Sequence, residues 1–293
     1  MNPLAGRLTD AERDNVVDAL AGRFDVDIHQ TTARDVAMKV AHSSVEAGSE
    51  LVIAFGGDGH VNEVANGLAG TESVLGIIPG GTMNVFARAL GIPVDPFAAI
   101  ENLERRQDGP ARRVSLGLMD DRYFTFSAGC GFDAEAAALV ERDMPRKRRF
   151  GEIFFYWSAF RVLATSYRHR DAVMTVKGSF GEERVAMAIG CNAGPYAYLR
   201  GRPIELAPHV RLQGRLDLFA MRTMRIEALP MYAWRCLVSG NLVRHHDVLY
   251  RSDLDAFEIE AEVPFARHVD GEPLLPSTSA RFSIEPDVLK VLA

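Results

Sequence analysis

The sequence predicts a two-domain protein in which an α/β domain is followed by a mainly antiparallel β domain. The first is indicated by two successive units of an apolar strand, a glycine-rich turn and a helix, over residues 51–68 and 74–90. Units of this kind build an open, parallel, Rossmann-like sheet. Near residue 112 the pattern changes to short strands separated by turns. We therefore expect one domain over 1–111 and a second over 112–280.

The composition is typical of a folded globular protein. The 293 residues are 47% hydrophobic and 25% charged. The three cysteines have no metal or redox spacing, which favours reduced thiols in a cytosolic protein. The start MNPLAGRLTD lacks the apolar core of a signal peptide, and no uncharged run reaches the roughly 20 residues that span a membrane. We expect a cytoplasmic protein without a transmembrane segment.

Two helices and a strand are expected before the first glycine turn. Thr9 and Glu12 form a capping-box pattern ahead of a helix that continues through Leu20. Residues 24–28 alternate as a strand does. Thr32 opens a second helix, which runs to about residue 47 and is ended by Gly48.

The first glycine turn has the chemistry of a phosphate site. Residues 51–55 read as a buried parallel strand, and GGDG at 56–59 leads directly into a helix through Leu68. Glycines let the backbone lie close to a ligand, and the helix start directs N–H groups at it. A tight connection is the alternative, because the chain matches neither the Walker loop nor the dinucleotide fingerprint. A carboxylate beside a phosphate needs a metal or a proton, so Asp58 is a candidate for magnesium or for the acceptor hydroxyl.

A second turn of the same kind follows. Residues 74–78 predict a strand that Pro79-Gly80-Gly81 ends, and Thr82 is placed to cap a helix through Leu90. Turns at the ends of neighbouring parallel strands face one crevice. Asp95-Pro96 then opens one more helix.

The second domain is expected to be mostly strands. The predicted strands are 112–119, 122–128, 171–177, 184–191, 215–221 and 256–262. Helices are expected at about 132–142, 152–166 and 226–239. Asp270-Gly271 taken alone indicates a surface hairpin.

Charge is concentrated in one segment. The chain has a net charge of −6, yet residues 142–170 hold eight Lys or Arg against Asp143 and Glu152. A solvated charged loop is one interpretation, and an anionic membrane surface is the functional one, supported by the aromatic-rich helix expected at 152–166. No basic fold motif accompanies the segment, which argues against nucleic acid.

Several motifs together resemble the diacylglycerol kinase catalytic domain family. They are GGDG followed by VNEVANGL, then GIIPGGTMNVFARALGIP, Asn2-Pro3 with Gly6, and Asp270-Gly271-Glu272. Bacterial lipid kinases and sphingosine kinases belong to this family, and NAD kinases share the GGDG turn. The resemblance implies a β-sandwich-like second domain, an active site between the domains, and a last strand, 281–293, that returns to the first domain. It also implies an apolar strand before Asn2, so we expect the codons upstream of Met1 to encode one.

The resemblance further implies ATP and Mg²⁺ as cofactors and assigns candidate residues. Glu272 would be the general base for the acceptor hydroxyl, with Asp270 beside it. Asp58 would act at the nucleotide and the metal, and Asp217 is a second candidate metal ligand. The candidate nucleotide-binding residues are Asn2, Gly56, Gly57, Gly59, His60, Glu63, Gly81, Thr82 and Asn84.

Four positions depart from the family pattern. His60 stands where Thr or Ser is usual, and Val85, Ser115 and Gln213 stand where relatives often carry an acid. The last three remove carboxylates, so an altered metal arrangement is an open alternative.

The sequence therefore predicts a lipid kinase that transfers the γ-phosphoryl group of ATP to a diacylglycerol-like or sphingoid-like hydroxyl. It would be peripherally associated with an anionic membrane through 142–170, and a homodimer is one possible assembly. An NAD kinase-like enzyme and a non-catalytic nucleotide- or lipid-binding module are the alternatives.

Overall fold

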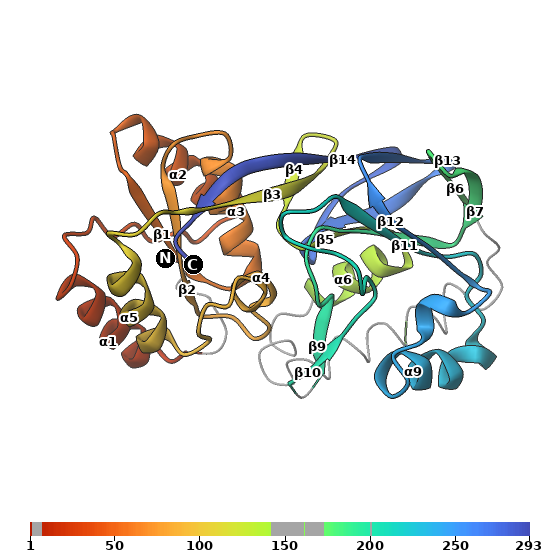
Figure 1. The fold of residues 1–293 in the computed structure, drawn as a ribbon, viewed down its shortest axis with the longest axis horizontal. Coiled ribbons are helices and arrows are strands. Elements are labelled where there is room, and N and C mark those ends of the chain that lie inside the picture. The colour runs from red at the N-terminus through yellow and green to blue at the C-terminus, as the bar shows by residue number, and fades with distance from the viewer. Residues whose placement is uncertain (2–7, 142–160, 162–172, 200) are drawn as a thin grey trace. The chain divides into compact units, whose positions relative to one another are not determined.

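The computed structural model describes residues 1, 8–141, 161, 173–199 and 201–293 (Figure 1). The chain forms two compact units, Met1–Ser115 with Pro286–Ala293 (unit 1) and Leu116–Glu285 (unit 2). Most of the basic segment 142–170 and of the helix expected at 152–166 lies outside the described residues.

Unit 1 is an α/β unit with a parallel sheet, as the sequence predicts. Its elements are α1 (Asp10–Ala21), α2 (Val36–Glu46), β1 (Leu51–Gly56), α3 (Asp58–Leu68), β2 (Val74–Pro79), α4 (Val85–Ala89) and α5 (Pro96–Arg106). β1 and β2 pair in parallel from Leu51↔Val74 to Gly56↔Pro79. The end of β14 (Glu272–Val291) adds a third parallel strand through Lys290↔Val74, so the chain end does return to this unit.

Local signals explain two helix starts. The Thr9 side chain accepts from the Glu12 amide and Glu12 accepts from the Thr9 amide, which confirms the capping box of α1. Asp95 caps α5 by accepting from the Ala98 amide, with proline in the first turn. The core under these helices contains Val16, Leu20, Phe55, Ile78, Ile100, Leu103 and Leu292.

Three local predictions for unit 1 were wrong. Residues 24–28 form no strand, because a strand requires a laddered neighbour and no described segment supplies one. α2 begins at Val36 rather than Thr32. Thr82 does not cap α4, since the helix begins after Asn84, whose φ of 49° turns the chain first.

Unit 2 consists mostly of antiparallel strands, which confirms the predicted class. Its elements are β3 (Arg112–Met119, which begins in unit 1), β4 (Arg122–Phe124), β5 (Ser127–Gly131), α6 (Phe132–Glu141), β6 (Met174–Gly178), β7 (Gly181–Val185), β8 (Met187–Cys191), β9 (Ala197–Leu199), β10 (Arg202–Ile204), β11 (Leu216–Met221), η1 (Ile226–Ala228), α9 (Leu229–Leu237), η2 (Leu242–Arg244), β12 (Val248–Leu254), β13 (Ala256–Val269) and most of β14. The order β13-β5-β8-β11-β12 is antiparallel throughout.

The core of unit 2 contains apolar side chains from most of these strands. The Phe257 and Phe282 rings stack with centroids 4.5 Å apart, and Phe124 meets Phe282 edge-on at 6.2 Å. Two predicted strands are each divided in two: 122–128 becomes β4 and β5, and 184–191 becomes β7 and β8. Among the described residues, no helix is long and apolar enough to cross a bilayer.

Candidate active site

The two glycine turns of unit 1 are in direct contact. β1 and β2 end at the same level, and the Gly80 amide donates to the Gly56 carbonyl at 2.8 Å. A Cβ on Gly81 would lie 2.6 Å from the Gly57 Cα, and one on Gly57 would lie 3.3 Å from the Gly81 Cα. The two backbones therefore pack at a distance that glycine alone allows.

Asn84 and Asp58 hold these turns in place. The buried Asn84 side chain accepts from the Gly81 amide at 2.9 Å and donates to the Gly81 carbonyl at 2.8 Å. Asp58, in the first turn of α3, accepts from the Phe86 amide at 3.3 Å. The α3 N-cap is Gly57, which has no side chain to accept from the first N–H groups of the helix. The turn thus presents donors and the positive end of a helix, which fits a phosphate group.

The remaining candidate nucleotide-binding residues of unit 1 do not all lie on the glycine turns. Thr82 is exposed on the second turn. Glu63 is buried and accepts from the Ala37 amide at 3.0 Å, so its carboxylate caps the start of α2. His60 lies under Gly56, where a glycine Cβ would meet the ring at 2.8 Å, and faces Thr31. Asn2 is outside the described residues.

In unit 2, Asp270-Gly271 forms the turn between β13 and β14, as the hairpin interpretation predicts. Both residues have positive φ, 48° and 81°, which is the conformation of a two-residue type I′ turn. Only half of the turn is at the surface, since Gly271 is exposed whereas the Asp270 side chain is buried. Glu272 is the first residue of β14 and is half-buried.

The Asp270 carboxylate is held by four hydrogen bonds. One oxygen accepts from the Thr125 amide and hydroxyl, both at 2.7 Å, and the other from the Phe126 and Ser127 amides, both at 3.0 Å. Burial raises the pKa of Asp270, and these donors act in the opposite direction. The carboxylate therefore anchors the turn to the break between β4 and β5.

Sequence reasoning missed a triad, with His268 and Asp133 buried and Tyr196 partly buried, that supports the same turn. The Gly271 amide donates to His268 Nδ1 at 3.1 Å, so His268 Nε2 carries a proton and donates to Asp133. The Tyr196 hydroxyl donates to the other Asp133 oxygen. These residues come from β13, α6 and the segment before β9, far apart in the sequence, and no local motif marks them.

Asp217 is engaged within unit 2. Its oxygens accept from the Tyr250 hydroxyl and from the Asp253 amide at 3.2 Å, and burial raises its pKa. Asp58, the other candidate metal ligand, belongs to unit 1.

The described residues include one set of three side chains whose potential ligand atoms lie within 4.8 Å of one another, His245, His246 and Asp247. Asp247 in this set already pairs with Arg225 at 3.2 Å, and a cation would compete with that guanidinium.

Besides His60, three positions depart from the family pattern, namely Val85, Ser115 and Gln213, and their surroundings are ordinary. Val85 is 1% exposed in the core of unit 1. Ser115 accepts from the Asp287 amide at 3.4 Å, and Gln213 is exposed.

The chain is similar in sequence to known proteins. The model of the diacylglycerol kinase catalytic domain matches residues 1–117. The chain is 31% identical over 263 residues to a Pseudomonas aeruginosa protein named "Probable lipid kinase YegS-like", a match that covers 87% of this chain and 80% of the relative. It is 35% identical over 254 residues to the diacylglycerol kinase of Bacillus subtilis, covering 85% and 80% respectively.

Solved structures show the same fold. A Bacillus anthracis diacylglycerol kinase matches 99% of this chain and 94% of its own, with a TM-score of 0.75 at 26% identity. An NAD kinase from Archaeoglobus fulgidus, solved in complex with ATP, matches 97% and 90% with a TM-score of 0.51 at 11% identity. The second likeness concerns the fold alone.

Proposed function

Since the chain belongs to the diacylglycerol kinase catalytic domain family, we propose that it is an ATP-dependent kinase that phosphorylates the hydroxyl of a diacylglycerol-like or sphingoid-like lipid. The kinase class follows from the relatives, which are lipid and diacylglycerol kinases. The use of ATP, the acceptor and the roles of individual residues are our proposal.

The contact between Gly57 and Gly81 is the observation that best supports nucleotide binding. Side chains at either position would fill the space where the two turns meet. The first N–H groups of α3 would donate hydrogen bonds to phosphate oxygens, and Gly56, Gly59 and the exposed Thr82 border the same turns. Asn84 keeps this surface rigid, which lowers the cost of ordering it around a ligand.

The turn before Glu272 supports its role as general base. A lipid alcohol is a weak nucleophile, and a positioned carboxylate that takes its proton accelerates the transfer. Asp270 and His268 fix the turn from inside, so Glu272 is presented by a rigid support. We assign proton transfer to Glu272 and a positioning role to Asp270.

Of the two candidate metal ligands, Asp58 is the better placed to hold Mg²⁺, because its carboxylate lies at the glycine turns. Bound Mg²⁺ would neutralise charge on the transferring phosphoryl group. Asp58 would orient the nucleotide at the start of α3, whereas the oxygens of Asp217 already accept two hydrogen bonds.

We further propose that the enzyme acts in the cytoplasm at an anionic membrane surface. The basic segment 142–170 supplies the charge for this attraction. Reversal of Arg146, Lys147, Arg148 and Arg149 to Glu should then reduce binding to anionic vesicles, and equal sedimentation of both proteins would contradict it.

An acceptor screen tests the function. The protein is incubated with γ-labelled ATP and a total lipid extract, with NAD in a parallel reaction and Glu272→Gln as the matched control. We expect label in a lipid product that the variant does not form. Label in NAD alone would overturn the lipid assignment, and ATP binding without transfer to any acceptor would overturn the activity.

A further inference from the structure

The outward side of α9 is apolar. Its exposed residues are Pro230, Ala233, Trp234 and Leu237, which recur at the spacing of one helical stripe. Trp234 is 61% exposed, and Val238, which directly follows the helix, is 62% exposed. A surface helix of a globular protein normally turns polar side chains outward. These five residues, here called the α9 face, reverse that pattern.

Polar contacts hold the opposite side of α9. The buried Tyr232 hydroxyl donates to Asp247 at 2.7 Å, and the Tyr232 ring meets the His245 ring edge-on at 5.7 Å. Asp247 also accepts from Arg225 at 3.2 Å. These contacts tie the helix to the segment that precedes β12, so they set the rotation of α9 and direct the α9 face outward.

The α9 face is a concentrated apolar surface. Figure 1 shows α9 outside the strands of unit 2, and its main neighbours among the described elements are η1 and η2. Trp234, Leu237 and Val238 lie within five consecutive positions. The other exposed large hydrophobic residues of the described chain are isolated in the sequence, at Ile28, Phe97, Val263 and Leu275. Isolated residues of this kind are normal, whereas a cluster indicates an interaction site.

The stretch that contains the α9 face is more basic than the rest of the chain. The charged residues of 225–247 are Arg225, Arg235, Arg244, Glu227 and Asp247. With neutral histidines this stretch carries +1 in a chain of −6, so the remainder carries −7. Since Asp247 is buried, the surface itself is more positive than this sum. Arginine beside an exposed tryptophan is complementary to anionic lipid headgroups.

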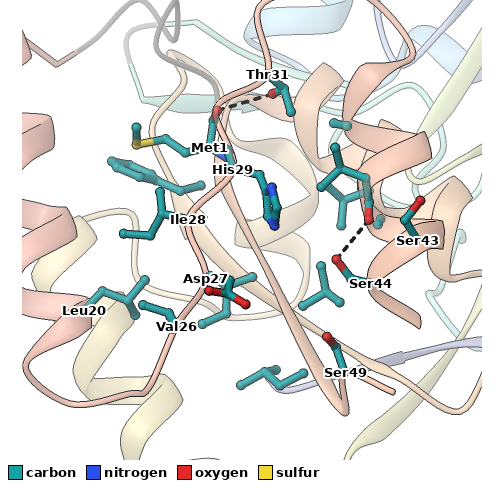
Figure 2. Close-up of a pocket in the computed structure, with 18 of the residues that line it drawn as sticks. Met1, Leu20, Val26, Asp27, Ile28, His29, Thr31, Ser43, Ser44 and Ser49 are labelled. Carbon is teal, nitrogen blue, oxygen red and sulfur yellow. Dashed lines mark hydrogen bonds between the residues drawn. The ribbon is translucent and has the colours of Figure 1, made fainter. Parts of the chain in front are cut away.

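A second apolar surface among the described residues is a recess. It is a groove of about 610 Å³ in unit 1, lined by the segment 24–28 and by β1, and Figure 2 shows Leu20, Val26 and Ile28 along it. A planar bilayer does not enter a recess. An outward helix face can instead lie within the headgroup region of a bilayer.

The size of the α9 face favours a bilayer over a protein partner. A helix of nine residues is about 14 Å long and about 10 Å across. A stable protein interface buries about 800 Å² on each partner, several times the outline of this face. A lipid surface requires no such area, and tryptophan with aliphatic neighbours is typical of helices that lie at a membrane interface.

We propose that the α9 face is a membrane anchor, which inserts Trp234, Leu237 and Val238 into the headgroup region of an anionic bilayer. Arg235 and Arg244 would lie at the level of the lipid phosphates. The inference rests on the proposed lipid kinase function, because a lipid acceptor lies in a bilayer. It adds an apolar contact in unit 2 to the charge attraction proposed for segment 142–170.

Fluorescence of Trp234 tests the insertion directly. The full chain carries Trp157→Phe, so that Trp234 is its single tryptophan. Vesicles contain phosphatidylcholine and phosphatidylglycerol, and a second set carries bromine on the acyl chains close to the glycerol. We expect the emission to shift to shorter wavelength on binding and to be quenched by the brominated lipid, because the indole leaves water. Unshifted and unquenched emission on vesicles that sediment the protein would overturn the anchor.

Val238→Asp and Val263→Asp form a matched pair of variants. The two valines have similar exposed fractions, 62% and 53%, and both substitutions add the same charge, but Val263 lies on β13. We expect Val238→Asp to weaken vesicle binding at least about tenfold, because it places a charge in the apolar part of the interface. Val263→Asp should have a clearly smaller effect. Equal losses in two folded variants would attribute binding to net charge and overturn insertion.

An assay with a water-soluble, short-chain diacylglycerol separates this inference from the proposed function. Val238→Asp should phosphorylate it as the parent protein does. Phosphorylation of this acceptor by a protein that does not bind vesicles would overturn the anchor and leave the kinase function standing. Insertion of Trp234 without transfer to any acceptor would support the anchor and overturn the kinase function.

A second copy of the chain is the alternative occupant of the α9 face. Sedimentation velocity without lipid should give the same mass for the parent protein and for Val238→Asp. A dimer that Val238→Asp dissociates would show that the second copy covers this face, and it would overturn the anchor.

Discussion

Replacing Asp270 by Asn tests whether this carboxylate is a structural anchor. Both oxygens accept hydrogen bonds, so the amide nitrogen must face donors in either orientation. On one side it would meet the Phe126 and Ser127 amides. On the other it would meet the Thr125 amide and hydroxyl, and the hydroxyl can turn to accept. At least one buried N–H therefore loses its acceptor, at a cost of about 1–3 kcal/mol.

The remaining bonds also weaken, because an ionised acceptor binds roughly twice as strongly as a neutral one. We expect Asp270→Asn to lower the free energy of unfolding by about 2–4 kcal/mol. In a unit of this size that corresponds to about 2–4 °C in melting temperature for each kcal/mol. Urea and thermal unfolding, followed by circular dichroism, measure the change.

Thr125→Val is the matched control for this prediction. It removes the hydroxyl donor and keeps the three amide donors, so we expect a loss of about 1–2 kcal/mol. Because both variants remove the same hydroxyl–carboxylate bond, the double variant should be less destabilised than the sum of the two. An Asp270→Asn protein within about 0.5 kcal/mol of wild type would refute the anchoring argument.

Glu272→Gln provides the contrast, because Glu272 is half-buried and lies beyond the anchored turn. We expect its unfolding free energy to remain close to that of wild type, while kcat falls by about 10²–10⁴. ATP affinity should be nearly unchanged, and the acidic limb of the pH profile of kcat should disappear. Near-normal kcat in Glu272→Gln would show that Glu272 is not the general base and is only a residue of the hairpin.

Three further predictions concern unit 1. Gly57→Ala places a Cβ 3.3 Å from the Gly81 Cα and should weaken ATP binding at least about tenfold in a calorimetric titration. Gly22→Ala, whose Cβ has ordinary contacts, should leave ATP affinity unchanged, and equal ATP affinities of the two variants would show that the glycine turns are not part of the nucleotide site. Val85→Asp buries a carboxylate in the core and should destabilise the protein by at least about 3 kcal/mol in thermal unfolding, so a stable variant with a lower magnesium requirement would contradict this packing role. Desolvation lowers the pKa of His60 to about 3, so below about pH 6.5 the unfolded state binds a proton that the folded state does not, and the free energy of unfolding should fall by about 2 kcal/mol between pH 6.5 and 5. Urea unfolding across this range should show a shallower dependence of stability on pH for His60→Gln than for wild type, and equal dependences would refute the assignment.

Local patterns in the sequence predicted the class of each unit and the two strand–turn–helix segments. They succeed because the signals are short-range: Thr9 and Glu12 lie one helical turn apart, and Asp95 directly precedes its proline. The turns at 56–59 and 79–81 were also predicted to share a crevice, since parallel neighbours end at the same edge. The structure adds that the two turns touch at Gly57 and Gly81.

Tertiary structure alone decided which polar residues act on the turn at Asp270. His268 and Asp133 are 135 positions apart, and nothing in either local stretch indicates that their side chains meet. Asp270 has the composition of a surface hairpin, and only the buried amides of residues 125–127 give it a structural role.

In the segment 24–28 the sequence predicts an element that the tertiary structure does not form. Its alternation favours a strand, yet a strand exists only when a neighbour completes its hydrogen bonds, and the described chain leaves a groove there. The sequence by itself therefore determined which segments are able to form strands, helices and phosphate-binding turns. Pairing and burial, which depend on residues distant in the chain, decided which of them do so and that the Asp270 carboxylate anchors a turn.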